Sequence, residues 1–191
     1  MEIGYMSMGL WKMMVDRMPL GSTVLPFWRG ESTMHPDFCE MISCLNGCKV
    51  VLATNGIITD KIIDVLPYID VINVSIHNQD SYTGYVSLRD HVIGSKPIVI
   101  ASMVEGERPL VENPRIYKKH SVDGSWGKVE EIPLGLSRGN SCSRLNETVL
   151  SWDGRSCRCC YVWDTSKTKQ FNYPDETCST CNQWAGGDRT L

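Results

Sequence analysis

The amino-acid sequence predicts an α/β protein, namely a partial, open barrel of parallel β-strands followed by a small cysteine-rich β-hairpin domain. Apolar runs rich in β-branched residues alternate with segments of helical periodicity through the first half of the chain, a pattern typical of parallel sheets with outer helices. These runs are continuous, as in strands that are covered on both faces. Six of the nine cysteines lie in the last fifty residues, which contain almost no continuous apolar run.

Each element has its own signal. Apolar residues at helical spacing predict a helix over residues 6–19, which Pro19 ends. A short apolar run predicts a first strand at 23–28, and Pro36 at a first helical turn begins a helix that ends near Gly47. The later elements are a strand at 49–54, a helix at 57–68, a strand at 70–76, a helix at 78–92 and a strand at 96–103.

Residues 105–140 interrupt this pattern with repeated proline and glycine and are interpreted as a linker that carries one last strand near 131–136. The predicted organisation is therefore a partial β/α barrel at 1–104, the linker and last barrel element at 105–140, and a cysteine-rich domain at 141–191. Within that domain, Asp153-Gly154 between two apolar runs predicts a β-hairpin with a two-residue turn.

Composition and charge exclude several classes of protein. A chain of 191 residues can hold one good core and a small appendage. The 19 basic and 22 acidic side chains give a net charge of −3, so we expect no nucleic-acid partner. Charged residues interrupt the apolar N-terminal stretch, so we expect neither an export signal nor a membrane span. A cytoplasmic protein with reduced thiols for metal binding or redox chemistry is the expectation.

Polar residues gather where the predicted strands end. Binding and catalytic groups of parallel α/β sheets lie at the carboxyl ends of the strands. These ends are expected to form a polar ring at one end of the barrel. They carry Arg29-Gly30-Glu31, Thr54-Asn55-Gly56, Ser75, His77 and Glu105.

Several of these segments resemble the radical S-adenosylmethionine enzymes. Residues 29–38, Arg-Gly-Glu-Ser-Thr-Met-His-Pro-Asp-Phe, are similar to the family's Gly-Gly-Glu-Pro segment and the His-Pro-Asp-Phe that follows it. Residues 54–56 are similar to its Thr-Asn-Gly, and residues 73–75 to the strand whose terminal serine faces the cofactor. By this resemblance the cofactor-binding residues are Gly30 and Glu31 at the methionine amino group, and Ser75 and Thr54 at the carboxylate or ribose.

The last fifty residues resemble the SPASM type of auxiliary iron–sulfur domain. Its opening pattern is matched by Cys142, eleven residues, Gly154, four residues and Cys159, and its later pair by Cys178-x-x-Cys181. The resemblance implies that four thiolates hold an auxiliary 4Fe-4S cluster. The implied ligands are Cys142, Cys159, Cys178 and Cys181.

Two alternatives stay open at these cysteines. Cys157 and Cys159 share one face of the predicted strand and Cys160 the other, because side chains alternate, so Cys157 is the preferred substitute ligand. Four thiolates also suit tetrahedral zinc. A non-catalytic zinc-binding interaction module is therefore the alternative function.

The chain also departs from the family pattern. No cysteine precedes Cys39, so the Cys-x3-Cys-x2-Cys loop of the catalytic cluster is missing, and Arg29 and Ser32 replace the expected Gly and Pro. We therefore interpret the chain as the C-terminal portion of such an enzyme, truncated or naturally short, and expect no cleavage of S-adenosylmethionine by it alone. The catalytic residues stay unassigned. The substrate also stays open, with a peptide, a sugar and a small metabolite as the options.

The remaining candidates have plainer interpretations. The thiols of Cys39, Cys44 and Cys48 are expected to pack on the core face of a helix. Glu31 has the alternative of capping the next helix or pairing with Arg29.

Overall fold

The computed structural model describes residues 4–26, 30–93, 97–104, 115–117, 149–150, 153–154 and 156–157. The chain divides into two units. The unit Tyr5–Lys118 contains a β-sheet with its helices, and the unit formed by Met1–Gly4 and Lys119–Leu191 contains a short β-hairpin. The strand predicted near 131–136 lies outside the described residues. So do the predicted metal ligands Cys142, Cys159, Cys178 and Cys181.

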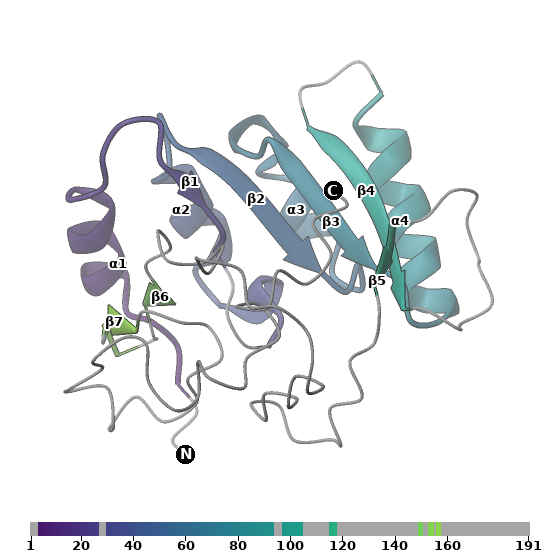
Figure 1. The fold of residues 1–191 in the computed structure, drawn as a ribbon, viewed down its shortest axis with the longest axis horizontal. Helices are drawn as coiled ribbons and strands as arrows, with labels where there is room; N and C mark the ends of the chain where they lie inside the picture. Colours follow the sequence, from purple (N-terminus) through teal and green to yellow (C-terminus); the bar gives the residue numbers. More distant parts are fainter. Residues whose placement is uncertain are drawn as a thin grey trace, which may run out of the picture. The chain divides into compact units, whose positions relative to one another are not determined.

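The predicted α/β class is confirmed by a sheet whose strands all run parallel in the order β1-β2-β3-β4-β5 (Figure 1). The first three connections each pass through helical residues, so that consecutive strands become parallel neighbours. The last strand, β5, occupies a segment that the sequence analysis interprets as linker. The strands are β1 (Thr23–Val24), β2 (Lys49–Thr54), β3 (Val71–Ser75), β4 (Ile98–Val104) and β5 (Arg115–Tyr117).

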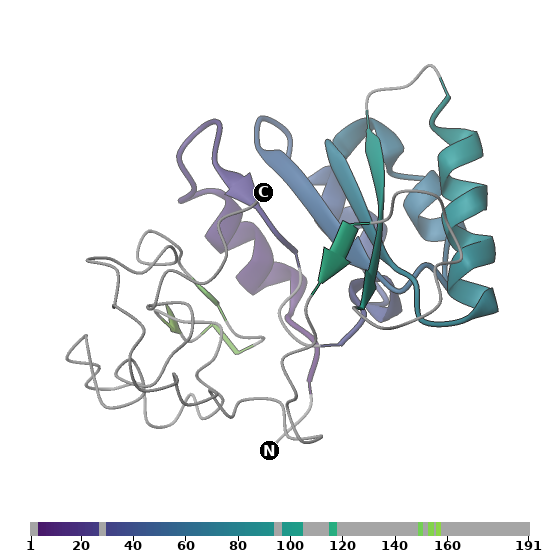
Figure 2. The same ribbon diagram turned by 45° about the vertical axis from the view of Figure 1, so that its right-hand side comes forward.

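The helices that connect the strands lie on one side of this sheet. Figures 1 and 2 show α2, α3 and α4 on the same face, with α1 beside the edge strand β1. The α-helices are α1 (Met8–Val15), α2 (Phe38–Ser43), α3 (Asp60–Ile63) and α4 (Gln79–His91), and the short 3₁₀ helices are η1 (Ser32–Met34) and η2 (Leu66–Tyr68).

Of two predicted helices, the structure confirms one and shows the other to be broken. The helix predicted over 78–92 is confirmed, and a capping box begins it, in which Asn78 and Ser81 each accept the other's backbone N–H. The continuous helix predicted over 57–68 is wrong, because α3 and η2 are separate. Pro67 near the start of η2 has no N–H to donate and cannot continue an α-helix.

The predicted hairpin is present, but its turn is not the predicted one. β6 (Val149–Leu150) and β7 (Ser156–Cys157) pair antiparallel, with Val149 opposite Cys157 and Leu150 opposite Ser156. In this register five residues, 151–155, separate the paired positions Leu150 and Ser156. A two-residue turn would leave an even number of residues between paired positions, so the register does not fit the predicted turn. The glycine of the predicted turn, Gly154, has a φ of +80°, which fits a turn position.

Burial alternates along the central strands. In β2 the side chains of Val50 and Leu52 are fully buried, whereas those of Val51 and Ala53 are half-buried. β3 shows the same alternation, with Ile72 and its like-facing neighbours toward the helices. The sequence predicts equal cover on both faces, but in β2 and β3 only the helix-facing side chains are fully buried, and those on the other face are partly exposed.

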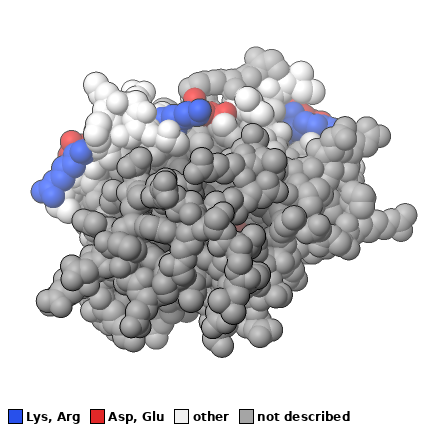
Figure 3. Space-filling model, in the orientation of Figure 1, with Lys and Arg blue, Asp and Glu red and all other residues white. Residues whose placement is uncertain are grey.

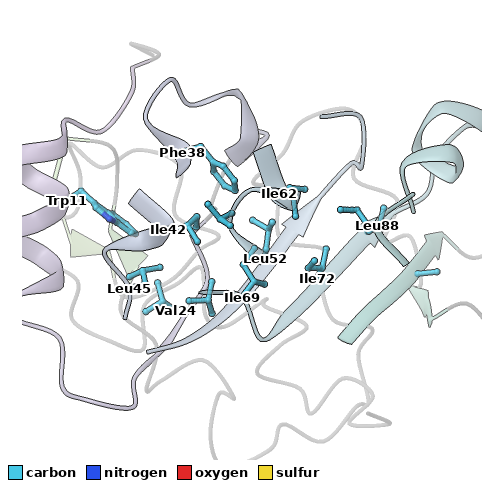
Figure 4. Packing of buried hydrophobic residues seen from close by; sticks show 14 of the residues in the cluster. Trp11, Val24, Phe38, Ile42, Leu45, Leu52, Ile62, Ile69, Ile72 and Leu88 are labelled. Carbon is cyan, nitrogen blue, oxygen red and sulfur yellow. The ribbon is translucent and has the colours of Figure 1, made fainter. Parts of the chain in front are cut away.

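The core fills the space between the sheet and its helices. Figure 4 shows it extending from Trp11 on α1, past Ile42 and Leu52, to Leu88 on α4. Three partly buried thiols pack against this core, as predicted. However, one helix does not carry them all, because the chain has left α2 before the third. They are Cys39, Cys44 and Cys48.

Trp11 joins the first helix to the second, and its replacement by phenylalanine tests that contact. The indole is 5% exposed, and its Nε1 donates to the carbonyl oxygen of Met41 at 2.8 Å. That carbonyl belongs to the last turn of α2, where oxygens have no partner within the helix. We expect Trp11→Phe to lower the free energy of unfolding by about 1–3 kcal/mol, measured by urea denaturation. A replacement of the exposed Met13 by leucine is the control, and equal stability of both variants would refute the role of Trp11.

Candidate functional site

The carboxylate of Glu31 joins two segments at the carboxyl edge of the sheet. Its Oε1 accepts hydrogen bonds from the hydroxyls of Thr33 and Thr54, each at 2.9 Å, and from the Thr33 N–H at 3.3 Å. Its Oε2 accepts from the Asn55 N–H at 2.7 Å. The chain that follows β1 is thereby tied to the residues that end β2. Glu31 also caps η1, which confirms the capping alternative.

The backbone around Glu31 explains how its carboxylate reaches these donors. Gly30 has a φ of +83°, a conformation that favours glycine. Ser32 Oγ donates to the carbonyl oxygen of Pro26 at 2.8 Å, which closes the chain on itself before η1. Residues 30–34 thus form a tight turn, and the Glu31 side chain points from it to the end of β2.

His35 holds the other end of this turn through both nitrogens of its ring. Nδ1 accepts the Asp37 N–H at 3.0 Å, so the proton lies on Nε2, which donates to the carbonyl oxygen of Met6 at 2.9 Å. The Tyr5 ring meets the imidazole edge to face, with 5.0 Å between centroids. These contacts make His35 a structural residue that fixes the segment before α1.

The Thr54-Asn55-Gly56 segment is a turn in which the Thr54 hydroxyl, the Asn55 side-chain oxygen and two backbone N–H groups are hydrogen-bonded. The Thr54 hydroxyl donates to Glu31 and accepts the Gly56 N–H at 3.1 Å. Asn55 Oδ1 accepts the Ile57 N–H at 2.9 Å, which is an Asx turn. Thr54 is 4% exposed and shares the level of the helix-facing Val74 in the sheet. Its hydroxyl is therefore occupied within the fold.

Gly56 makes this turn compact enough for α4 to pack on it. Its φ is +72°, and a Cβ there would lie 2.8 Å from Cγ1 of Val74. A Cβ at Gly84 in α4 would overlap the carbonyl oxygen of Gly56. The two glycines therefore allow helix and turn to approach backbone to backbone. The sequence signal for this contact is a glycine inside a helical pattern.

Ser75 ends β3 on the sheet face that points away from the helices. The ladder pairs it with Ser102 of β4, and it is half-buried. One step earlier on the same face, Asn73 Oδ1 accepts a hydrogen bond from the Ser102 hydroxyl. Because Thr54 is level with Val74, Ser75 stands one residue further along, at the level of Asn55. Polar groups of β3 and β4 therefore lie side by side on this face, whereas Thr54 at the end of β2 is on the helix-facing side.

Lys61 is a site residue that the sequence analysis does not identify. Its ammonium donates to the carbonyl oxygens of Thr33 and His35, both at 2.9 Å. The lysine belongs to α3 and is half-buried. It is 28 residues away from Thr33 in the sequence, and no local sequence pattern predicts a contact between residues so far apart.

The charged side chains of the described residues that Figure 3 shows are of both signs. On the face shown in Figure 3, basic and acidic side chains of the described residues lie next to one another in separate small groups. Lys12 pairs with Glu40 and Arg89 with Asp90, and the hydrogen bond and attraction of each carboxylate raise the pKa of its basic partner. Neither pair contacts Glu31.

The structure brings part of the predicted site together. Gly30, Glu31 and Thr54 are joined by hydrogen bonds or by chain continuity, and Ser75 stands at the same edge. Within the described ranges, no group of three or more His, Cys, Asp or Glu side chains could hold a metal ion. None of the helices described there has the length and apolar character of a membrane span.

The described residues use the two oxygens of Glu31 unequally. A carboxylate offers about four lone-pair positions. Within the described part of the chain, three donors converge on Oε1 and one, the Asn55 N–H, reaches Oε2. The Thr54 hydroxyl is buried, donates to Glu31 and accepts the Gly56 N–H, so it is engaged within the fold on both sides.

Comparisons with known proteins identify no relative: no protein-family model, no curated protein and no solved structure matches this chain.

Proposed function

We propose that this chain is the C-terminal portion of a radical S-adenosylmethionine enzyme with a SPASM-type auxiliary domain. The observation that carries the proposal is the Glu31 carboxylate, which donors of the described residues hold where β1 and β2 end, with a single one of these donors on Oε2. The consecutive parallel strands with helices on one face support a partial, open β/α barrel. The motif order along the chain supports the family.

The residues of the barrel would bind and orient the cofactor. Gly30 and Glu31 would receive its methionine amino group, and Ser75 would meet its carboxylate or ribose from the neighbouring strand. Thr54 would contribute by holding Glu31, with which it shares a hydrogen bond of 2.9 Å. Together with a reduced iron–sulfur cluster, S-adenosylmethionine supplies hydrogen-atom abstraction from a substrate. The substrate class is not assigned.

The chain alone is expected to produce no 5′-deoxyadenosine, because no cysteine precedes Cys39 to form the family's catalytic cluster loop. The test is anaerobic reconstitution with iron and sulfide, addition of S-adenosylmethionine and dithionite, and quantification of 5′-deoxyadenosine by chromatography. Multiple turnovers would contradict the expectation. They would show that another set of thiolates, in this chain, holds a catalytic cluster.

The auxiliary cluster is tested by removing two of its proposed ligands. We expect the reconstituted protein to be brown and to contain about four iron atoms. The double variant Cys178→Ala/Cys181→Ala should lose that absorbance and most of the iron. The matched control is Cys44→Ala/Cys48→Ala, which also removes two thiols but should retain the chromophore. Stoichiometric zinc and no colour in anaerobically purified protein would instead establish the alternative, a zinc-binding interaction module.

A further inference from the structure

The Lys61 side chain is hydrogen-bonded to backbone carbonyl oxygens. Its Nζ lies 2.9 Å from the carbonyl oxygens of Thr33 and His35. Lys61 is absent from the ion pairs found among the described residues. Ordering a long, half-buried lysine costs side-chain entropy and hydration. Two hydrogen bonds from a charged donor offset that cost, so the contact with the turn is specific.

Thr33 connects this lysine to the carboxylate of the site. The Thr33 carbonyl accepts from Lys61, while its N–H and hydroxyl both donate to Glu31 Oε1. The residue is fully buried in the short helix η1, so its three polar groups cannot move independently. A displacement of the carbonyl away from Lys61 would therefore withdraw two of the three donors from Oε1.

We propose that Lys61 is a positioning residue for Glu31. By holding the carbonyls of Thr33 and His35, it keeps the donors of Thr33 on Oε1, so that Oε2 receives a single donor, the Asn55 N–H, from the described residues. Lys61 thus sets the position of the Glu31 carboxylate through Thr33. A ligand bound by Glu31 would contact Oε2, the oxygen that the Asn55 N–H already holds. The identity of that ligand as S-adenosylmethionine rests on the proposed function, but the positioning itself does not.

Amide hydrogen exchange in the full chain separates positioning from a general effect on stability. In Lys61→Met the methionine keeps most of the apolar stem and removes both hydrogen bonds. We expect exchange of the Thr33 and Asn55 amides, which donate to Glu31, to become roughly tenfold faster or more. The amides of Leu52 and Ile72 in the central strands should change by less than about twofold. Lys12→Met, at an exposed lysine, is the control and should leave all four unchanged.

An unchanged rate at Thr33 and Asn55 in Lys61→Met would overturn the proposal. So would an equal acceleration of all protected amides, since that result shows loss of global stability. A titration with S-adenosylmethionine, followed by the Asn55 amide resonance, tests the ligand. No shift in the wild-type chain would overturn the proposed function, while the exchange rates would still decide the role of Lys61. A shift in wild type that weakens in Lys61→Met supports both.

Discussion

Replacing Gly84 with alanine is expected to lower the free energy of unfolding by about 3 kcal/mol, the upper end of the usual range for overpacked sites. The new methyl group would overlap the carbonyl oxygen of Gly56 and lie 2.7 Å from its carbonyl carbon. Both atoms belong to backbone, which cannot rotate away as a side chain can. α4 would have to shift away from the turn that follows β2, and the contacts of its buried Leu88 would loosen.

Gly84→Ala and a control substitution at an open helix position are expected to change the free energy of unfolding in opposite directions. In an open helix, alanine is more favourable than glycine by roughly 0.8–1 kcal/mol. Gly9 in α1 provides the matched control, because a Cβ there meets no atom within 4 Å. We expect Gly9→Ala to raise stability and Gly84→Ala to lower it in the same urea titration. A stabilising Gly84→Ala would show that α4 and the Gly56 turn are not in backbone contact.

The effect should also reach the candidate site. The turn that α4 supports contains Asn55, whose N–H donates to Glu31 Oε2. If α4 shifts, this hydrogen bond is expected to weaken, and the Asn55 amide should lose protection beyond the change in global stability. The close approach of Gly56 and Gly84 therefore contributes to the site as well as to the core.

The sequence predicted correctly the elements whose positions are determined by neighbouring residues in the chain. β2 occupies residues 49–54 as predicted, because a β-branched run between two glycine-containing turns has no competing helical pattern. α4 follows its capping residues Asn78 and Ser81. The broken helix at 57–68 carried its own signal in Pro67, which the apolar periodicity around it obscured.

The site was predictable only in part, because its contacts are long-range. The motif order pointed to Glu31, and the structure places its carboxylate at the strand ends. Thr33 and Lys61 had no such signal, since their roles arise from a turn and a helix that meet only in the folded chain. The proposed cluster ligands lie outside the described residues, and the argument for them is the spacing of the cysteines in the sequence.

Glu31→Gln is the second large effect, expected to cost about 2 kcal/mol. Glutamine has the same size but offers one acceptor oxygen and one NH₂ group. Whichever way the amide turns, its NH₂ faces either the Asn55 N–H or the donors of Thr33 and Thr54. One donor set therefore loses its acceptor, and the turn after β1 is less firmly held to β2.

Urea denaturation at neutral pH measures this loss, with Glu40→Gln as the control. Glu40 is exposed and pairs with Lys12 on the surface, so its replacement should leave stability nearly unchanged. A double-mutant cycle with Thr54→Val should give a coupling free energy of about 1 kcal/mol or more, because the two side chains are in direct contact. Additive effects would contradict the shared hydrogen bond.

The same variant distinguishes a carboxylate that only supports the fold from one that also binds a ligand. A ligand that binds only the native state raises the Tm by an amount that grows with the ratio of the free ligand concentration to its Kd. If Glu31 Oε2 receives an ammonium group, S-adenosylmethionine should raise the Tm of the wild-type chain more than that of Glu31→Gln. Glu31→Gln and Trp11→Phe lower stability through different contacts, so only the former should lose the ligand response. An equal response in both variants would leave Glu31 with its structural role alone.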